Sequence, residues 1–341
     1  MFYELAKKAL FASDPETAHY LSMESLRRAH QLGATRLLCT HRDIPLKCMG
    51  LNFGNPVGIA PGLDKNADYF EALGALGFGF IEVGTITPKP QAGNPKPRVF
   101  RLPQAQALIN RLGFNNKGVD HLVAQVRKRK YDGVLGINIG KNATTPIAQA
   151  ADDYLHCLQQ VYPYADYVTV NISSPNTQNL RELQAEDSLN QLLSQLAVER
   201  NKLQKTHGRR VPMAVKIAPD LDHAGLEAVA RAISLHDIEA VIASNTTTSR
   251  PWVEGLPHAA EAGGLSGAPL KALADQTLVE LRELLPNSVD LIGVGGICSG
   301  QDAVDKLDMG ASLVQFYTGM IYRGPALLAE CLQAIAERKV A

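Results

Sequence analysis

The sequence has no net charge, few cysteines and no long apolar run, and each absence narrows its possible functions. Its 34 Lys and Arg residues balance 34 Asp and Glu residues, so no general attraction to nucleic acid is expected. The five cysteines are scattered, without a C-x-x-C pair or zinc-type His spacing, which predicts no metal site and a reducing compartment. Neither a membrane-spanning run nor a signal-peptide core is visible, so any work at a membrane is expected from its surface.

A dinucleotide-binding fingerprint is also absent. No G-x-G-x-x-G follows the first predicted strand, which argues against a nicotinamide-binding Rossmann unit. The 341 residues are 45% hydrophobic and 20% charged, which is typical of a folded protein with a substantial core. This length fits either one large α/β barrel with an extension or two ordinary domains.

Residues 1–40 differ in pattern from the rest of the chain. They predict two short amphipathic helices, and the second begins at Ser13-Asp-Pro-Glu16, which indicates a capping box with proline in the first turn. Such a helix pair could pack on the main domain as a lid, or it could dip into a bilayer interface. On the residues alone, packing is favoured.

From residue 45 onward, short apolar segments alternate with helical patterns. Eight such units in series predict an α/β fold, a (β/α)8 TIM barrel over residues 45–341, once a long insertion is allowed between residues 84 and 134. The chain is therefore expected to combine an N-terminal two-helix extension, residues 1–40, with this barrel. The predicted strands are 56–60, 80–84, 134–137, 167–170, 213–217, 240–243, 291–294 and 313–316.

Polar residues follow almost every predicted strand, at the end of the barrel where active sites lie. The segment from Asn171 to Thr177 offers amides and hydroxyls without a charge. That composition suits a planar ligand rich in heteroatoms, although an ordinary Ser/Asn turn is the alternative. Lys65 and Lys216 stand at two other strand ends, where a buried ammonium needs a partner.

Glycines follow the last two predicted strands. Gly295-Gly296 and Thr318-Gly319 match the position of the phosphate site that is common in such barrels, although a tight turn would use the same residues. Together with the missing dinucleotide fingerprint, this position favours a mononucleotide such as FMN.

Six motifs, in order along the chain, closely resemble the quinone-dependent, membrane-associated class 2 of the dihydroorotate dehydrogenase family. They are Gly62-Leu-Asp-Lys65, Glu82-Val-Gly-Thr-Ile-Thr-Pro88, Asn110-Arg-Leu-Gly-Phe-Asn-Asn116, Gly136-Ile-Asn-Ile-Gly-Lys141, Asn171-Ile-Ser-Ser-Pro-Asn-Thr177 and Gly293-Val-Gly-Gly-Ile297. The resemblance covers nearly the whole chain and is strongest to enzymes of Gram-negative bacteria. It implies an FMN-containing oxidoreductase that converts (S)-dihydroorotate to orotate in pyrimidine biosynthesis and reduces ubiquinone or menaquinone.

The resemblance also implies roles for individual residues in the reaction with dihydroorotate. Ser174 matches the catalytic base, Thr177 the relay that takes its proton, and Phe114 the side chain that closes this path. Class 1 enzymes have cysteine at the position of Ser174, so the serine favours class 2. The residues that match the substrate site are Lys65, Asn110, Arg111, Leu112, Gly113, Phe114, Asn171, Asn176, Asn245 and Thr246.

Flavin contacts follow from the same motifs. Lys216 matches the cation that stabilises the reduced ring. Pro61 stands where relatives commonly have alanine and Ser244 where many have threonine, and both changes spare the chemistry. The residues that match FMN contacts are Pro61, Gly62, Leu63, Asp64, Lys65, Thr85, Asn138, Asn171, Lys216, Ser244, Gly267, Gly296, Tyr317 and Thr318.

The resemblance reverses the preference for simple packing of the N-terminal helices. In class 2 they form the mouth of a quinone tunnel and rest on the membrane, with His19, Arg101 and Tyr317 matching the tunnel residues near the flavin. The chain is then expected to be a monomeric peripheral protein at the cytoplasmic face of the bacterial inner membrane. A class 1 enzyme, a dihydrouridine synthase or a catalytically silent scaffold are the rival interpretations; the serine and the N-terminal helices disfavour the first, and the neutral charge without a tRNA-binding extension disfavours the second.

Overall fold

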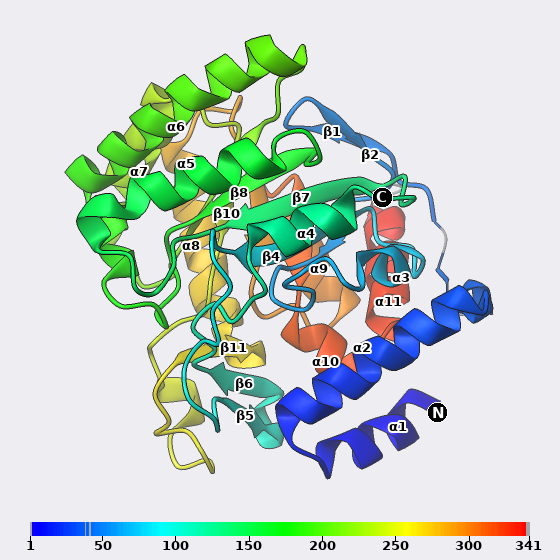
Figure 1. The fold of residues 1–341 in the computed structure, drawn as a ribbon. Coiled ribbons are helices and arrows are strands. Elements are labelled where there is room, and N and C mark those ends of the chain that lie inside the picture. Colours follow the sequence, from blue (N-terminus) through cyan, green and yellow to red (C-terminus); the bar gives the residue numbers. More distant parts are fainter. Residues whose placement is uncertain (1, 38, 41, 339–341) are drawn as a thin grey trace.

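The computed structural model describes residues 2–37, 39–40 and 42–338. At its centre eight parallel strands form a closed barrel in the order β10-β12-β13-β3-β4-β7-β8-β9, and β9 pairs with β10 to complete the ring. Helices follow the strands and surround the barrel (Figure 1). The predicted (β/α)8 barrel is therefore confirmed, and two helices precede it at the N-terminus.

The described strands and helices have the following bounds. The strands are β1 (Leu46–Cys48), β2 (Leu51–Phe53), β3 (Val57–Ile59), β4 (Phe80–Ile86), β5 (Val99–Leu102), β6 (Ala107–Asn110), β7 (Val134–Ile139), β8 (Tyr167–Asn171), β9 (Met213–Ile217), β10 (Ala240–Ala243), β11 (Gly264–Gly267), β12 (Asp290–Val294) and β13 (Leu313–Phe316). The α-helices are α1 (Phe2–Phe11), α2 (Pro15–Gln31), α3 (Phe70–Gly74), α4 (Val119–Val126), α5 (Ala150–Val161), α6 (Glu186–His207), α7 (His223–Leu235), α8 (Lys271–Leu284), α9 (Gly300–Asp308), α10 (Thr318–Arg323) and α11 (Ala326–Arg338).

Every predicted strand segment forms one of the barrel strands. All residues of β4, β7 and β8 are buried, because helices cover the outer face of a parallel barrel while side chains fill its interior. This burial explains why the strands were recognisable as short, nearly continuous apolar runs.

The insertion after β4 folds into a small sheet that the sequence did not specify. β5 and β6 form an antiparallel hairpin, and β11 pairs with β6 from a distant part of the chain. Phe100, Ile109 and Leu265 belong to its own apolar cluster. In Figure 1 this sheet lies at one end of the barrel, next to α1 and α2.

The β1–β2 hairpin closes the opposite end of the barrel. The ring of Phe53 packs edge-on against Phe80 with 5.4 Å between centroids. The backbone N–H of Met49 donates to a carboxylate oxygen of Asp290, the first residue of β12, at 2.6 Å. Because the hairpin closes the end of the barrel where the strands begin, a ligand can enter only where the strands end, at their C-terminal ends.

The N-terminal helices are attached to the rest of the protein by specific polar contacts. The hydroxyl of Tyr3 donates to the carbonyl of Ile321 at 2.7 Å, and the Lys7 ammonium donates to the carbonyl of Tyr322 at 3.0 Å. Glu16 on α2 forms an ion pair with Arg98 at 2.8 Å. Within the part of the chain that the structure describes, no helix is both long enough and apolar enough to cross a membrane.

The predicted capping box at the start of α2 is wrong in detail. Asp14, not Ser13, is the N-cap, and its carboxylate accepts from the backbone N–H of Thr17 at 2.9 Å. The Ser13 hydroxyl instead donates to the carbonyl of Leu10. With Asp14 as the N-cap, Glu16 is the second helical residue and not the third, which the box requires. Its carboxylate instead forms a tertiary ion pair with Arg98.

Candidate active site

A cavity of about 160 Å³ lies at the C-terminal ends of the barrel strands, between the barrel and the small sheet. Amides, hydroxyls and glycines form much of its wall, and apolar side chains from β5, β6 and β13 also line it. The predicted substrate and cofactor residues that line it are Pro61, Gly62, Lys65, Thr85, Asn110, Leu112, Gly113, Phe114, Asn171, Ser174, Asn176, Lys216, Ser244, Asn245, Thr246, Gly267, Gly296, Tyr317 and Thr318.

A buried polar layer inside the barrel supports the floor of the cavity. Glu82 is completely buried and accepts hydrogen bonds from Asn138, Tyr167 and Gln315, each at 2.8 Å. A buried carboxylate is tolerated when its oxygens are satisfied in this way. Asn138 in turn accepts from the side-chain amide of Asn171 at 3.2 Å, so the network reaches the wall of the cavity.

Two lysines bring positive charge to the cavity. Burial lowers the pKa of Lys65 to about 8, with Glu16 opposing the shift, and burial also lowers the pKa of Lys216, which Glu82 opposes. No described residue accepts a hydrogen bond from either ammonium group, although both lysines line the cavity. Lys216 is buried and Lys65 is half-buried. Two such cations without a hydrogen-bonding partner in the described chain fit an anionic or electron-rich ligand.

The segment after β8 presents the predicted base. Ser174 is 6% exposed, and its hydroxyl oxygen accepts from the backbone N–H of Asn176 at 3.3 Å. Asn176 also donates through its side-chain amide to Asn110 at 3.3 Å. The turn therefore joins Ser174 to the predicted substrate amides on the small sheet.

Of the other two predicted catalytic residues, Phe114 lines the cavity and Thr177 lies behind its wall. The Thr177 hydroxyl is buried and has no hydrogen-bond partner within the described residues, and Thr177 does not line the cavity. Phe114 does line it and has a left-handed φ of 52°. A bulky residue rarely adopts that conformation outside a functional or strained site.

Two glycines of the cavity wall, Gly296 after β12 and Gly267 at the end of β11, pack closely against neighbouring backbone. A Cβ atom added to Gly296 would lie 2.4 Å from the Cα of Lys271, and one added to Gly267 would lie 2.2 Å from the carbonyl oxygen of Gln106. Both residues have a positive φ, at 78° and 100°. Larger residues would therefore distort this part of the cavity, which fits a cradle for a phosphate.

Four of the predicted substrate and cofactor residues do not line the cavity. The Arg111 guanidinium points to Glu261, at 2.6 Å, and to the carbonyl of Pro97. Asp64 accepts from the backbone N–H groups of Asp68 and Tyr69 at 2.9 and 2.7 Å, so it shapes the loop, and burial raises its pKa to about 6. Leu63 belongs to the core, and Asn138 stands behind Asn171.

Sequence reasoning missed several lining residues. Ser266 accepts a hydrogen bond from the Thr318 hydroxyl at 2.8 Å, and Leu270 and Ile297 add apolar surface. Ser266 could have been found from its place beside Gly267, just before a Pro-containing helix start. Ile297 ends one of the six motifs and could have been found from it. Leu270 carries no comparable signal, because an apolar side chain near a helix start is normally part of the core.

A second cavity of about 670 Å³ lies under the N-terminal helices. It shares five wall residues with the first cavity: Lys65, Val99, Leu108, Leu112 and Tyr317. His19, Arg101 and Tyr317, the predicted quinone residues, all line it. Burial, together with the charge of Lys65, lowers the pKa of His19 to about 4, so its ring is neutral near pH 7.

Comparison with known proteins identifies the same family that the sequence motifs resemble. The family model described as dihydroorotate dehydrogenase matches residues 44–338. A protein named dihydroorotate dehydrogenase (quinone) from Burkholderia multivorans is 56% identical over 340 residues, covering 99% of both chains. A protein with the same name from Bordetella parapertussis is 57% identical and covers 98% of this chain and 97% of its own.

Solved structures agree with this similarity. The ligand-free DHODH from Eimeria tenella superimposes with a TM-score of 0.87 at 38% identity and covers 95% of this chain and 94% of its own. The same enzyme in complex with ferulenol gives a TM-score of 0.86 at 37% identity, covering 95% of this chain and 91% of its own.

Proposed function

The chain belongs to the dihydroorotate dehydrogenase family, and we propose that FMN and dihydroorotate bind side by side in the cavity at the C-terminal end of the barrel. The enzyme oxidises dihydroorotate to orotate in pyrimidine biosynthesis and uses a quinone as electron acceptor. The observation that carries this proposal is that two ammonium groups with lowered pKa values, those of Lys65 and Lys216, line one cavity together with neutral amides. Orotate-like rings combine imide, amide and carboxylate groups, which such a set of side chains complements.

FMN fits the part of the cavity wall that is formed at the ends of β11, β12 and β13. Gly296, Gly267 and Thr318 line the part of the wall that would hold the phosphate, and Lys216 would lie against the ring. The two glycines let this wall pack directly on the backbone of Lys271 and Gln106. When bound, FMN accepts a hydride from the substrate and passes the electrons on. Lys216 would stabilise the negative charge that this transfer places on the ring.

Ser174 is the residue best placed to remove the substrate proton. It lines the cavity beside the amides of Asn171 and Asn176, which would orient the pyrimidine ring. The buried Thr177 hydroxyl, which no described residue engages, is available to take the proton onward, with Phe114 covering the path. A serine needs such assistance, because its hydroxyl is a poor base by itself.

The cofactor part of the proposal is tested by releasing the bound chromophore. Purified protein should be yellow, and heat denaturation should release FMN in a ratio of about one per chain, identified by chromatography against FMN and FAD standards. Release of FAD, or a colourless protein that FMN does not restore, would contradict the assignment.

The charge of Lys65 leads to a pH prediction. A lysine whose pKa is lowered to about 8 is an ammonium below that pH and loses its charge as the pH rises through it. Binding of the orotate anion should therefore weaken above pH 8 in the wild type. The loss should reach about 10- to 100-fold, the range of a charge-assisted hydrogen bond.

Orotate titrations monitored by the flavin spectrum between pH 6 and 9.5 measure this effect. The Lys65→Met variant should bind orotate weakly at every pH, without the step near pH 8. A step of equal size in Lys65→Met would assign the titration to another group.

The N-terminal helices are proposed to bind the membrane surface from the cytoplasmic face of the bacterial inner membrane and to admit ubiquinone or menaquinone to the second cavity. Leu21, Leu32 and Leu37, on α2 or just after it, are 49%, 85% and 89% exposed, so three leucines of this segment are available to enter a lipid surface. Neutral His19 could donate a hydrogen bond to a quinone carbonyl near Tyr317. The enzyme is proposed to work there as a monomer.

Vesicle binding tests this attachment. Leu32→Glu should weaken sedimentation with quinone-containing vesicles by about 10-fold, because one leucine no longer enters the apolar layer. Its turnover with a short-chain soluble quinone should stay at the wild-type value. The matched control is Leu235→Glu, at a leucine that is 72% exposed at the end of α7, and equal weakening by both changes would argue against attachment through the helices.

A further inference from the structure

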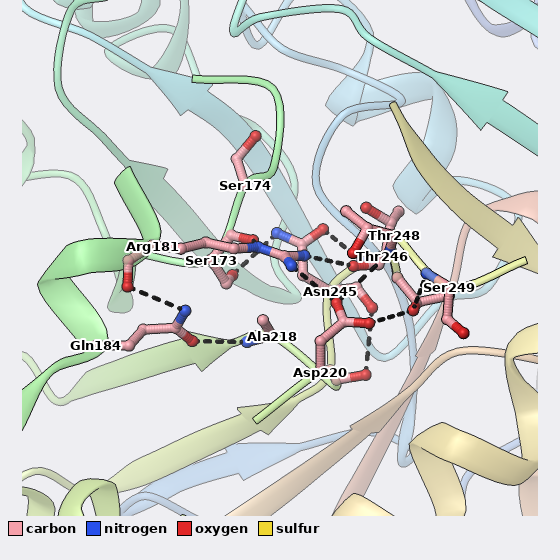
Figure 2. A network of polar contacts seen from close by, with 12 residues as sticks. Ser173, Ser174, Arg181, Gln184, Ala218, Asp220, Asn245, Thr246, Thr248 and Ser249 are labelled. Atoms are coloured by element: carbon pink, nitrogen blue, oxygen red, sulfur yellow. Dashed lines mark hydrogen bonds and ion pairs between the residues drawn. The ribbon is translucent and has the colours of Figure 1, made fainter. Parts of the chain in front are cut away.

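Arg181 connects three loops at the rim of the active-site cavity. It lies in the 3₁₀ helix η4 (Leu180–Gln184), a few residues after Ser174. Its Nε donates to the carbonyl of Ser173 at 3.0 Å, and its Nη2 donates to the carbonyl of Thr246 at 2.9 Å. Figure 2 shows the guanidinium between these two segments, which follow β8 and β10.

The third connection is an ion pair with the loop after β9. Arg181 Nη1 lies 2.8 Å from Asp220 Oδ2, and the two side chains are only 24% and 21% exposed. Asp220 also accepts from the hydroxyl of Thr247, which is completely buried, and from the backbone N–H of Thr248 at 3.4 Å. The carboxylate thus fixes the guanidinium and the loop after β10 at the same time.

A second side chain of η4 reinforces this arrangement. Gln184 is 4% exposed and accepts from the backbone N–H of Ala218 at 2.9 Å. Arg181 and Gln184 are three residues apart, so they project from the same side of a 3₁₀ helix. Both hold η4 against the loop after β9 (Figure 2).

The bonded carbonyls are direct neighbours of proposed reaction residues. Ser173 precedes Ser174, and the Ser173 hydroxyl accepts from the side-chain amide of Asn245 at 2.9 Å. On the other side of Ser174, the carbonyl of Asn176 accepts from Asn94 at 3.3 Å. In Figure 2 the Ser174 hydroxyl points away from the Arg181 network. Ser174 therefore lies between two anchors, one of which is Arg181, and does not itself bond to the guanidinium.

We propose that Arg181, paired with Asp220, is a positioning residue for the dihydroorotate half-reaction, which it serves by fixing Ser174 relative to Asn245 and Thr246. This inference rests on the proposed role of Ser174 as the base. The pair is neutral overall, so it acts through geometry. Lysine cannot replace it fully, because three directed N–H bonds require the planar guanidinium.

Rapid-mixing measurements of the two half-reactions test the proposal in FMN-loaded protein. Arg181→Gln should lower the rate of flavin bleaching by dihydroorotate, per bound flavin, by about 10- to 100-fold. This is the range for a slightly misplaced reacting group. Reoxidation by quinone and the FMN content should stay within about twofold of the wild type. The bleaching rate of Arg181→Lys should lie between those of the wild type and Arg181→Gln.

An isotope effect separates positioning from simple loss of folding. With dihydroorotate deuterated at C5, the isotope effect on bleaching should increase in Arg181→Gln, because proton removal becomes slower. Asp220→Asn should behave like Arg181→Gln, and the double variant should be no worse than either single one, since both changes break the same pair.

Two other arginine variants serve as matched controls. Arg231→Gln removes a surface ion pair with Glu186 at 3.1 Å and should leave both half-reactions unchanged. Arg200→Gln removes a buried pair with Glu239, which precedes β10 at the other end of the barrel, and should lower the melting temperature without changing the bleaching rate per flavin.

Unchanged bleaching in Arg181→Gln, or parallel losses of FMN, bleaching and reoxidation, would overturn the positioning role. Ser174→Ala measured beside these variants separates this inference from the proposed function. If Ser174→Ala bleaches normally, the base assignment fails; if only the Arg181 variants bleach normally, the positioning role fails alone.

Discussion

Replacing Ser174 with alanine is expected to leave FMN bound and to slow flavin bleaching by dihydroorotate about 100- to 10,000-fold, the contribution that general base catalysis normally makes. The serine is almost completely buried beside the proposed substrate amides, and alanine removes only its hydroxyl. Anaerobic stopped-flow absorbance of the flavin measures the rate directly, and quinone reoxidation of chemically reduced enzyme should be unchanged.

Ser174→Cys provides the matched comparison. A thiol keeps a group that can accept the proton, so part of the rate should remain, with a pH profile displaced from that of the wild type. If Ser174→Ala bleaches as fast as the wild type, another residue is the base.

The second large effect is expected at Lys216. Lys216→Met should make the flavin midpoint potential more negative and slow bleaching by about 100- to 1,000-fold, the usual cost of removing one preorganised electrostatic contact. Lys216 is buried against the cavity, and Glu82 is the charged group that opposes its lowered pKa. Without the ammonium, Lys65 is the one cationic side chain left among the described residues that line the cavity. Spectroelectrochemistry measures the potential.

Lys306→Met is the control for loss of a buried lysine. Its ammonium lies 2.6 Å from Asp275 and does not line the cavity. This change should lower stability, because the buried ion pair is broken, and should leave the midpoint potential at the wild-type value. A Lys216→Met protein with an unchanged potential would place its ammonium away from the ring.

The barrel could be predicted because each strand is buried on both faces. β4 and β8 read as short apolar runs followed by polar loops, and eight repeats of that pattern leave few other folds. The small sheet was not predictable in this way. β11 contains two glycines and a serine among its four residues, and its partner β6 lies over 150 residues earlier in the chain.

For the candidate site, the sequence located the segments correctly but did not show which of their side chains face the cavity. Motifs identify a segment, but within a strand or turn neighbouring side chains face opposite ways. Asn110 and Arg111 are adjacent, yet Asn110 lines the cavity while Arg111 turns to Glu261. Arg181 was missed for a related reason, since its partners are carbonyls and a carboxylate on three separate loops.

The most direct test of the whole account is the visible spectrum of the anaerobic protein during successive additions. Dihydroorotate should bleach a yellow flavin, and a soluble quinone should restore the colour, whereas fumarate or NAD should not. A flavin that dihydroorotate leaves oxidised, or one that fumarate or NAD reoxidises as readily as quinone does, would contradict it.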